Sequence, residues 1–445
     1  MTYSEAKNFF YSLENLGRKE YLKDPRDAVV YLKRLQVLLD ILGNPERRIP
    51  HYIHVAGTSG KGSVCLMLDA IWRAAGKKVG TLTSPGIEGL LDRTMVNGKQ
   101  ISKKEFAELT AKLAQALEVY MNRSRFDVPS PFEVLTALAL LYFARHKVEW
   151  AIIEVGLGGR YDSTNIIPYK DVAVITNIGL DHTEILGNTK EKIAYEKAGI
   201  VKKNNLVFTQ ERNQKVLAVI QRECRKQKVL LHNVSGSTYQ VAGGDLTGTD
   251  FIFQNKSYHL PVLGAHQIQN AVLCIEIARS VGIKDAVIQK GLNKLVLPIR
   301  MEIISKKPLI ILDGAHNEDK MSSSISTIQT LKNNNRTIEQ LNNTHLVVGF
   351  AADKDITAMV KQLAELKPKT IACTRFVSNI FRRTADPREL AEQFRKLLPR
   401  TKTKLFLNPH EALRWSQAQA GKQDCVLVTG SIFLSGDLRT DFRKI

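Results

Sequence analysis

The sequence predicts an α/β protein of two domains, built on mostly parallel sheets that are covered by helices on both faces. Three observations carry this prediction. The chain has 445 residues, whereas one domain usually holds about 100 to 200. Its predicted strands are almost wholly apolar and lack the polar alternation of a half-exposed sheet. Strands and helices alternate along most of the chain, which is the order of a parallel sheet.

The N-terminal part begins with a predicted helix. Its apolar residues recur at helical spacing from Val29 to Leu42, and Gly43-Asn44-Pro45 ends it. A second helix follows a short strand within the stretch from His54 to Gly76. The predicted strands of this part are 52–56, 79–83, 150–155 and 172–176.

The pattern changes after residue 238. Between Tyr239 and Leu263 short runs alternate, which predicts a small antiparallel subregion, and helices are expected at 267–280 and 286–295. A second series of strands then predicts a Rossmann-like C-terminal α/β domain, with strands within 309–315, 346–352, 370–374, 404–408 and 426–430. We therefore predict domains at residues 1–296 and 297–445.

Composition indicates a soluble globular protein, with 44% hydrophobic and 24% charged residues. The first twenty residues lack the pattern of a signal peptide, and the longest nearly apolar run, 134–144, is too short to cross a bilayer. We expect a cytoplasmic protein without a membrane partner. The five cysteines are scattered without metal-ligand spacing, so they are expected to be reduced core residues.

The net charge of +20 raises the question of nucleic-acid binding. The basic residues are dispersed and form only short clusters such as Lys202-Lys203, so we expect no nucleic-acid partner. An anionic nucleotide and a polycarboxylate substrate explain a positive field equally well.

The stretch HVAGTSGKGS predicts a phosphate-binding loop between a strand and a helix. Its glycines let successive backbone N–H groups converge on phosphate oxygens at the positive end of the helix. Lys61 can reach the outer phosphates, and the Ser63 hydroxyl suits a magnesium ion. The loop departs from the usual GxxxxGK[ST] spacing. Its candidate nucleotide-binding residues are Gly57, Thr58, Ser59, Gly60, Lys61, Gly62 and Ser63.

Two further polar residues follow predicted strands. Glu154 ends a buried strand, and His182 comes soon after the next one. Ligands bind at the carboxyl ends of strands in parallel sheets, so both are candidate site residues. A helix cap or an ion pair with Arg160 remains open for Glu154, as does a structural role for His182.

Several ordered motifs give the chain a family resemblance. They are LGNP at 42–45, HVAGTSGKGS at 54–63, TSP at 83–85, FEVLTALAL at 132–140, EVGLGGRYDSTN at 154–165, GLDHTEILGNTKEKIAYEKAGIVK at 179–202, LGAHQIQNA at 263–271, DGAHN at 313–317, ADKDI at 352–356 and VTGS at 428–431. In these motifs the chain resembles the folylpolyglutamate synthases, the folate branch of the Mur ligase superfamily. The resemblance implies an ATP- and folate-binding N-terminal domain and a C-terminal glutamate-ligase domain that closes over the nucleotide.

The resemblance also implies cofactors and their ligands. Magnesium would be held by Ser63, Ser84, Glu154 and His182, together with the nucleotide phosphates. Lys197 matches a lysine that the family carries as a carbamate and joins Lys61 as a catalytic residue; without the resemblance it would be an ordinary lysine at a helix C-terminus. A monovalent cation is left open.

Further contacts are implied on the nucleotide side. Asn270 would lie near the adenine, Arg300 near the phosphates and Asp313 near the ribose, while His316 is a catalytic candidate. From the residues alone, Arg300 could be a linker charge and His316 a helix cap.

The folate side matches the family less closely. The implied folate-binding residues are Ser130, Tyr161, Asp162, Ser163 and Arg93. Of these, Ser130 and the Tyr161-Asp162-Ser163 run could equally be structural. The segment after Thr83-Ser84-Pro85 reads Gly86-Ile87 and later Asp92-Arg93, where the family usually has histidine with a bulky apolar residue and then Glu-Arg. Ser59 replaces a usual asparagine, and Leu297-Pro298-Ile299-Arg300 replaces Trp-Pro-Gly-Arg.

The expected reaction is ATP-dependent amide formation between a folate carboxylate and L-glutamate, through an acyl phosphate. Dihydrofolate synthase activity on dihydropteroate is left open. The alternatives are a Mur-type ligase with another carboxylate acceptor and a paralogue that binds nucleotide or folate without turnover. We expect a monomer whose partners are small molecules, namely ATP, L-glutamate and the folate or dihydropteroate.

Overall fold

The computed structural model describes residues 1–18, 28–333, 341–379 and 382–442. The chain divides into two compact units. The first comprises Met1–Gly86, Leu90–Thr238 and Gln269–Leu292, and the second comprises Ile87–Gly89, Tyr239–Ile268 and Asn293–Ile445. The first unit is built on one sheet, and the second contains a larger and a smaller sheet.

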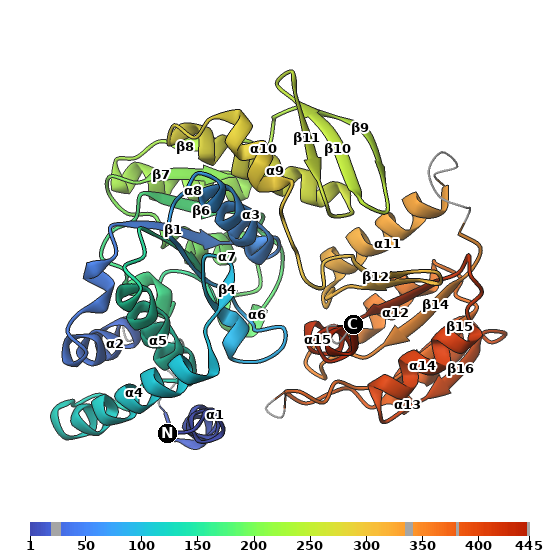
Figure 1. Ribbon diagram of the computed structural model, residues 1–445, viewed down its shortest axis with the longest axis horizontal. Helices are drawn as coiled ribbons and strands as arrows, with labels where there is room; N and C mark the ends of the chain where they lie inside the picture. Colours follow the sequence, from blue (N-terminus) through green and yellow to red (C-terminus); the bar gives the residue numbers. More distant parts are fainter. Residues whose placement is uncertain (19–27, 334–340, 380–381, 443–445) are drawn as a thin grey trace. The chain divides into compact units, whose positions relative to one another are not determined.

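The first unit holds an eight-stranded sheet in the order β4-β3-β2-β5-β1-β6-β7-β8 (Figure 1). Its strands are β1 (His51–Ala56), β2 (Val79–Leu82), β3 (Thr94–Val96), β4 (Lys99–Gln100), β5 (Trp150–Glu154), β6 (Val172–Ile175), β7 (Leu206–Thr209) and β8 (Leu231–Asn233). The six strands from β2 to β8 are parallel, and only the β3–β4 edge is antiparallel.

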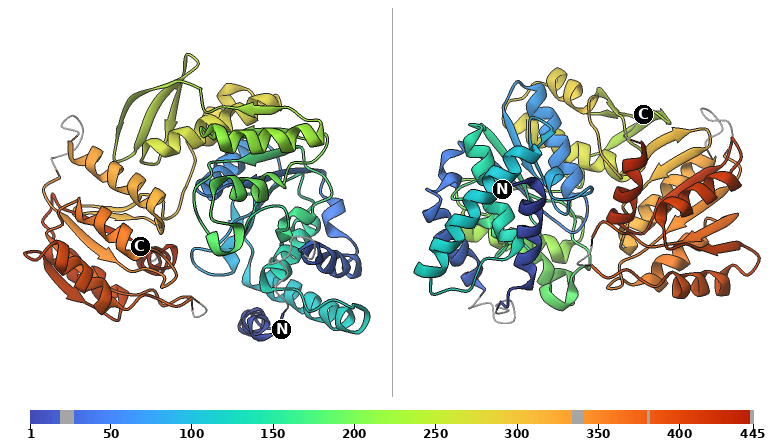
Figure 2. Two further views of the ribbon diagram at one scale, coloured as in Figure 1. Left: turned by 180° about the vertical axis from the view of Figure 1, so that it is seen from behind. Right: turned by 60° about the horizontal axis from the view of Figure 1, so that its bottom comes forward.

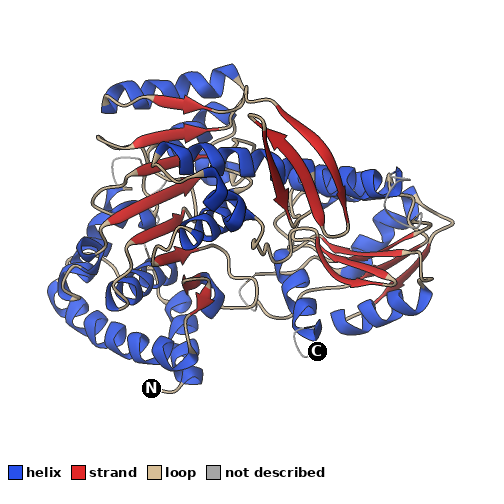
Figure 3. Cartoon of the chain, turned by 45° about the horizontal axis from the view of Figure 1, so that its top comes forward, coloured by secondary structure: helices blue, strands red, loops and turns tan. Residues whose placement is uncertain are grey.

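Helices cover this sheet, and Figure 3 shows them in front of it and behind it. They are α1 (Tyr3–Ser12), α2 (Val29–Ile41), α3 (Lys61–Ala74), α4 (Lys103–Arg123), α5 (Pro131–Arg145), α6 (Thr183–Leu186), α7 (Lys190–Ala198), α8 (Gln214–Gln227), α9 (Ala265–Ser280) and α10 (Asp285–Leu292). Short 3₁₀ turns are η1 (Leu13–Asn15), η2 (Pro45–Arg48), η3 (Leu91–Arg93) and η4 (Ser163–Ile166). Ala151 and Ile153 of β5 pack with α2, α4 and α5, while Ala173 and Ile175 of β6 pack with α7 and α8.

The second unit holds a six-stranded sheet in the order β12-β13-β17-β14-β15-β16. The strands of this sheet and the helices beside it are coloured orange and red in Figure 2. Its strands are β12 (Glu302–Lys306), β13 (Leu309–Leu312), β14 (Thr344–Val348), β15 (Thr370–Cys373), β16 (Lys402–Leu405) and β17 (Cys425–Thr429). Its helices are α11 (Glu318–Asn333), α12 (Ile356–Ala364), α13 (Pro387–Leu397), α14 (Pro409–Gln419), α15 (Ile432–Arg439) and the turn η5 (Thr440–Phe442). Only β12 is antiparallel to its neighbour.

Both faces of this second sheet are buried. Leu309 and Ile311 of β13 pack with α11, α12 and α13, while Ile310 and Leu312 of the same strand pack with α14 and α15. Successive residues of a strand point to opposite faces, so a strand covered on both sides must be apolar throughout. This explains why the strand sequences show no polar alternation.

A separate antiparallel sheet, in the order β11-β10-β9, contains β9 (Tyr239–Asp245), β10 (Gly248–Phe253) and β11 (Lys256–Leu260). It confirms the predicted antiparallel subregion. Residues 239–268 belong to the second unit, although they were predicted to lie in the N-terminal domain. Residues 269–292 belong to the first unit. The predicted division into a nucleotide- and folate-binding domain and a glutamate-ligase domain near residue 297 remains a prediction.

The predicted α/β class is confirmed, and the predicted helix after residue 28 is α2. The antiparallel edge strands β3, β4 and β12 were not predicted. All five cysteines are buried and free of disulfide bonds. Across the described ranges, the helices are too short or too polar to span a membrane.

Candidate active site

The loop after β1 approaches its neighbours so closely that it requires glycine. Gly57 has φ of +149°, and a Cβ there would lie 1.8 Å from Thr176 Oγ1. Gly60 caps α3 with φ of +84°, and a Cβ there would lie 2.8 Å from Asn270 Oδ1. A side chain at either position would displace a polar neighbour. The glycines therefore hold the loop against β6 and α9, at the N-terminus of α3.

Hydrogen bonds fix this loop to the segment that follows β6. Asn177 Oδ1 accepts from Ser59 N at 3.0 Å, and its carbonyl accepts from Thr58 N at 2.8 Å. The buried Ser59 hydroxyl has no hydrogen-bond partner among the described residues. An unsatisfied buried donor is costly unless a ligand engages it, so this hydroxyl is consistent with a bound polar group.

Lys61 and Ser63 lie in the first turn of α3. Lys61 Nζ donates to the Gly57 carbonyl at 3.1 Å, which folds the ammonium back over the loop. Ser63 is buried, with 4% of its surface exposed. Both predicted phosphate-loop side chains thus lie at the positive end of the α3 dipole.

Glu154 lies beside the same loop. It pairs in register with Val55 of the neighbouring strand, two residues before Gly57. Glu154 is 4% exposed, and its Oε2 accepts from Ser84 N at 2.9 Å. Two predicted metal ligands, Glu154 and Ser84, are therefore adjacent at the carboxyl edge of the sheet.

Arg160 was the alternative ion-pair partner that the sequence left open for Glu154. Its guanidinium donates to Glu223 Oε2 at 3.0 Å and lies 4.0 Å from the centroid of the Tyr195 ring. The packing of Arg160 thus involves α7 and α8.

His182 caps α6 with a left-handed backbone, φ of +51°. This conformation is uncommon for residues other than glycine and recurs at functional sites. The side chain is 42% exposed, with Nε2 3.9 Å from Asp181 Oδ1. No group of three or more His, Cys, Asp or Glu side chains suited to a metal is found in the described part of the chain.

A cavity of about 190 Å³ lies in the first unit. Its lining is formed by Tyr31, Ser130, Phe132, Glu133, Leu157, Gly158, Gly159, Tyr161, Asp162, Ser163, Leu186 and Glu196. Four of the five predicted folate-binding residues are in this lining; the fifth, Arg93, is not. The segment 157–163 leads directly from Glu154, so one short stretch of chain runs from the metal candidate to the cavity wall.

A buried polar chain supports the cavity wall behind Asp162. Thr164 Oγ1 donates to Asp162, and His54 Nε2 lies 2.8 Å from Thr164 Oγ1. Lys170 Nζ lies 3.0 Å from His54 Nδ1 and donates to Asn165 Oδ1 at 2.6 Å. Because Thr164 donates to the carboxylate, it accepts from His54, whose other nitrogen then accepts from Lys170. This network was not predicted, since its members lie on different elements.

We predict that His54 makes stability depend on pH. Burial, helped by the charge of Lys170, holds the pKa of His54 well below its usual value. Below about pH 6.5 the unfolded chain binds a proton that the folded chain does not, so the free energy of unfolding falls as pH drops, by up to about 1.4 kcal/mol per pH unit. His54→Gln should flatten that slope in urea unfolding, and an unchanged slope would contradict the assignment.

Lys197 lies in the last turn of α7, next to a residue that lines the cavity. It is 5% exposed, and its carbonyl would lie 3.0 Å from a Cβ at Gly159. Its neighbour Glu196 lines the cavity, and burial raises the pKa of Glu196, opposed by Arg160 and Lys197. The last turn of α7 is thus packed against the glycine turn that follows β5.

Arg93 ends η3 and lies near the metal candidates. Burial lowers the pKa of its guanidinium, opposed by Asp92, Tyr11 and Glu154, and its Nε has no hydrogen-bond partner among the described residues. The charge of Glu154 therefore acts on Arg93, and Arg93 is not among the residues that line the cavity.

Asn270 of α9 meets the phosphate loop at Gly60 and accepts from Gln210 Nε2 at 2.9 Å. Sequence reasoning missed Gln210 and Asn177. Both lie just beyond the carboxyl ends of strands, β7 and β6, which is the signal that could have found them.

The other predicted nucleotide residues belong to the second unit. Asp313 follows β13, is 5% exposed, and accepts from Met301 N at 3.0 Å and Ser324 Oγ at 2.6 Å. Arg300 donates to the Ile299 carbonyl at 3.2 Å. These contacts gather the two predicted nucleotide residues of this unit near the end of β13.

His316 also follows β13. Its Nδ1 lies 2.8 Å from the Gly314 carbonyl, so it carries the proton, and Nε2 lies 3.0 Å from Lys320 Nζ. His266, which was not predicted, lies close enough to Asp313 and Arg300 for both to affect its charge. Burial lowers the pKa of His266, Asp313 opposes that effect and Arg300 adds to it.

Comparison with known proteins places this site in a family. Residues 55–278 match the Mur ligase middle domain, and residues 299–432 match the glutamate ligase domain of Mur ligases. The dihydrofolate synthase/folylpolyglutamate synthase of Bacillus subtilis (strain 168) is 34% identical over 424 residues, covering 92% of this chain and 94% of that protein. The chain belongs to the folylpolyglutamate synthase and dihydrofolate synthase family.

Further members of this family support the assignment. The folylpolyglutamate synthase of Lacticaseibacillus casei is 32% identical, covering 82% of this chain and 83% of that protein. The structure of Mycobacterium tuberculosis folylpolyglutamate synthase complexed with ADP matches with a TM-score of 0.86 at 27% identity, over 99% of this chain and 98% of that one. E. coli FolC in complex with DHPP and ADP matches with a TM-score of 0.80 at 28% identity, over 99% and 98%.

Proposed function

We propose that this chain uses ATP to join L-glutamate to the carboxylate of a folate, through an acyl phosphate. The observation that carries the proposal is the continuity of β5 with its loop: Glu154 lies beside the phosphate loop, and residues 157–159 and 161–163 line the cavity. The phosphate loop would bind ATP and the cavity the folate. Family membership supports the same reaction class, an acid–amino-acid ligase.

The chemistry needs activation because a carboxylate does not react with an amine. A carboxylate oxygen of the folate attacks the γ-phosphorus, and the bond to the ADP oxygen breaks. The neutral amine of glutamate then attacks the acyl carbon; the tetrahedral intermediate expels phosphate and the nitrogen loses a proton. Lys61 and the N–H groups at the start of α3 stabilise negative charge on the transferring phosphoryl group.

Magnesium fits the residues at the carboxyl edge. Ser63, Ser84 and Glu154 offer oxygen donors, one of them a buried carboxylate, and His182 an imidazole. Mg²⁺ usually binds through one or two carboxylates plus substrate phosphates and keeps several waters, so a larger protein cluster is not required. When bound, it would neutralise charge on the phosphates. A monovalent cation, the catalytic role of His316 and a monomeric state stay predictions.

Lys197 is the proposed carbamate. Carbamylation adds CO₂ to an uncharged amine and releases a proton, so it replaces a cation with an anion. Lys197 is buried in the last turn of α7. The product would be an anion beside the cavity.

We predict that Lys197→Ala lowers kcat by about 10²-fold, the loss typical of removing one electrostatic stabiliser. Acetate or formate should restore part of the activity by supplying a carboxylate in the vacated space. Lys190→Ala, an exposed lysine at the start of the same helix, is the control and should keep wild-type activity. Full activity of Lys197→Ala would contradict the carbamate role.

The proposed function is tested by product analysis. Purified protein is incubated with Mg-ATP, L-glutamate and either a reduced folate monoglutamate or dihydropteroate, and products are identified by mass. The proposal expects a glutamylated folate; a product from dihydropteroate as well would add dihydrofolate synthase activity. No product from either acceptor, with ATP binding intact, would favour a ligase for another carboxylate or a paralogue without turnover.

A further inference from the structure

We propose that Arg34 is a positioning residue for the folate, because its guanidinium holds two parts of the cavity wall in place without itself lining the cavity. The inference rests on the proposed function of the cavity as the acceptor site. Arg34 lies on α2 and is 1% exposed. It is 99 residues from Glu133 and 93 from Asp127 in the sequence, so no local motif predicts these contacts.

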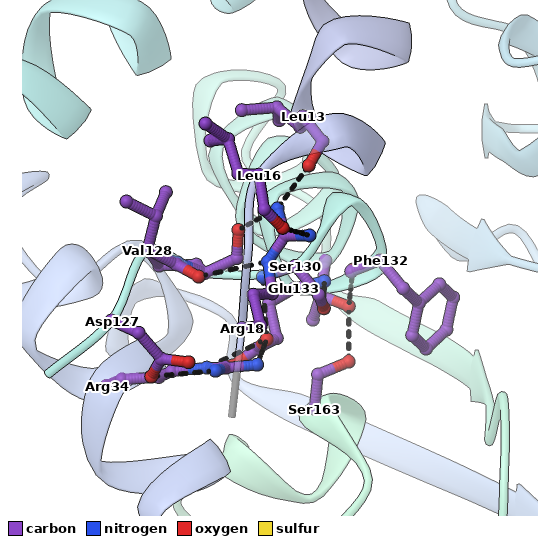
Figure 4. A network of polar contacts seen from close by, with 12 residues as sticks. Leu13, Leu16, Arg18, Arg34, Asp127, Val128, Ser130, Phe132, Glu133 and Ser163 are labelled. Atoms are coloured by element: carbon purple, nitrogen blue, oxygen red, sulfur yellow. Dashed lines mark hydrogen bonds and ion pairs between the residues drawn. The ribbon is translucent and has the colours of Figure 1, made fainter. Parts of the chain in front are cut away.

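The first wall is the start of α5. Arg34 Nε donates to both Glu133 oxygens at 2.8 and 3.0 Å, and Nη1 donates to Asp127 at 3.0 Å (Figure 4). Glu133 in turn accepts from Ser130 N at 2.8 Å, while Ser130 Oγ accepts from Glu133 N at 3.3 Å. Ser130 and Glu133 both line the cavity. One buried guanidinium therefore fixes the capping box that forms this wall.

The second wall is Tyr31. The Arg34 guanidinium lies 4.8 Å from the centroid of the Tyr31 ring, which also lines the cavity. The two contacts come from one planar group, so the orientation of α5 and that of the tyrosine ring are linked.

A second arginine, Arg18, fixes the main chain between Asp127 and Glu133. Arg18 Nε donates to the Val128 carbonyl at 3.1 Å, and its Nη2 donates to Pro129 at 3.3 Å and to Leu13 (Figure 4). Burial and the nearby charge of Arg34 lower the pKa of Arg18. Arg18 thus acts on backbone carbonyls, whereas Arg34 acts on the side chains that shape the cavity.

The geometry predicts that charge alone does not replace Arg34. A lysine carries the same charge but cannot bridge Glu133 and Asp127 with a fixed planar fork. Arg34→Lys should therefore loosen the cavity wall while leaving the phosphate loop, on another part of the unit, unaffected. A misplaced wall weakens acceptor binding more than nucleotide binding.

The experiment measures steady-state kinetics and direct binding of a reduced folate monoglutamate by fluorescence. Arg34→Lys is expected to raise both KM and Kd for the folate about tenfold or more, with KM for ATP within about twofold. Arg34→Met/Glu133→Gln removes the charge of Arg34 and that of its more buried partner, while Asp127, with 16% of its side chain exposed, keeps contact with solvent; this variant should fold but keep the high KM. Arg145→Met, which removes an exposed ion pair to Glu108 at the far end of α5, should match wild type.

The outcomes are distinct. Unchanged folate KM in Arg34→Lys, or loss of kcat with unchanged KM, would mean that Arg34 is only structural and overturn the inference. Recovery of wild-type KM in the double variant would mean that Arg34 only neutralises Glu133, and this result would overturn the inference as well. If wild-type protein neither binds nor converts the folate, the proposed function fails and the inference fails with it.

Discussion

Glu154→Gln is expected to reduce kcat by about 10³-fold, the upper range for loss of one electrostatic stabiliser, while the fold stays intact. Glutamine preserves the volume of the side chain and can still accept from Ser84 N, a bond that measures 2.9 Å in the native chain. The substitution removes the negative charge of Glu154, a residue that is 4% exposed and lies beside the phosphate loop. A neutral amide cannot balance a divalent cation there. The measurement is kcat for ADP release, with the unfolding midpoint as the check on folding.

Glu149→Gln is the matched control for this variant. Glu149 precedes the same strand, and its Oε2 likewise accepts a backbone N–H, from Lys78 at 2.9 Å. Its side chain is 47% exposed and lies at the opposite end of β5. It should keep wild-type kcat. Full activity of Glu154→Gln would exclude Glu154 as a metal ligand.

Lys61→Met should lower kcat by about 10²- to 10³-fold, because a charge that stabilises the transferring phosphoryl group is lost. The Lys61 ammonium lies 3.1 Å from the Gly57 carbonyl, over the loop that would hold the phosphates. Methionine has a similar length, so packing at the start of α3 changes little. Initial rates of ADP release at saturating ATP measure the effect.

Two variants make the Lys61 result specific. Lys77→Met removes a half-exposed lysine beyond the other end of α3 and should leave kcat unchanged. Lys61→Arg keeps the charge in a bulkier, planar group and should recover only part of the rate. If Lys61→Met retained full kcat, the phosphate loop would not be the site of phosphoryl transfer.

Much of the fold was predictable because a strand that is buried on both faces of a sheet must have apolar residues at successive positions. Ile310 and Ile311 belong to opposite cores, so β13 had to be apolar at every position. The phosphate loop was equally clear, since Gly57 and Gly60 are positions where a Cβ would collide. Residues at strand ends, such as Glu154, followed from the same topology.

Features that depend on distant partners could not be predicted. Arg34 binds carboxylates that lie on and before another helix, and Lys170 reaches His54 across the interior. Neither contact has a periodicity or spacing in the sequence. The edge strands β3 and β4 are too short to carry a pattern. The role of each predicted site residue, including Arg93 outside the cavity lining, stays a prediction until tested.

In the proposed reaction, this chain activates a folate carboxylate as an acyl phosphate. The direct test is oxygen transfer: a folate labelled with ¹⁸O at both oxygens of the reacting carboxylate is incubated with Mg-ATP, L-glutamate and the protein. For the first glutamate added, each phosphate released should carry one ¹⁸O atom, and the product should be heavier by one glutamyl residue. Glutamylation with unlabelled phosphate, or ATP hydrolysis without a glutamylated product, would contradict the proposed reaction.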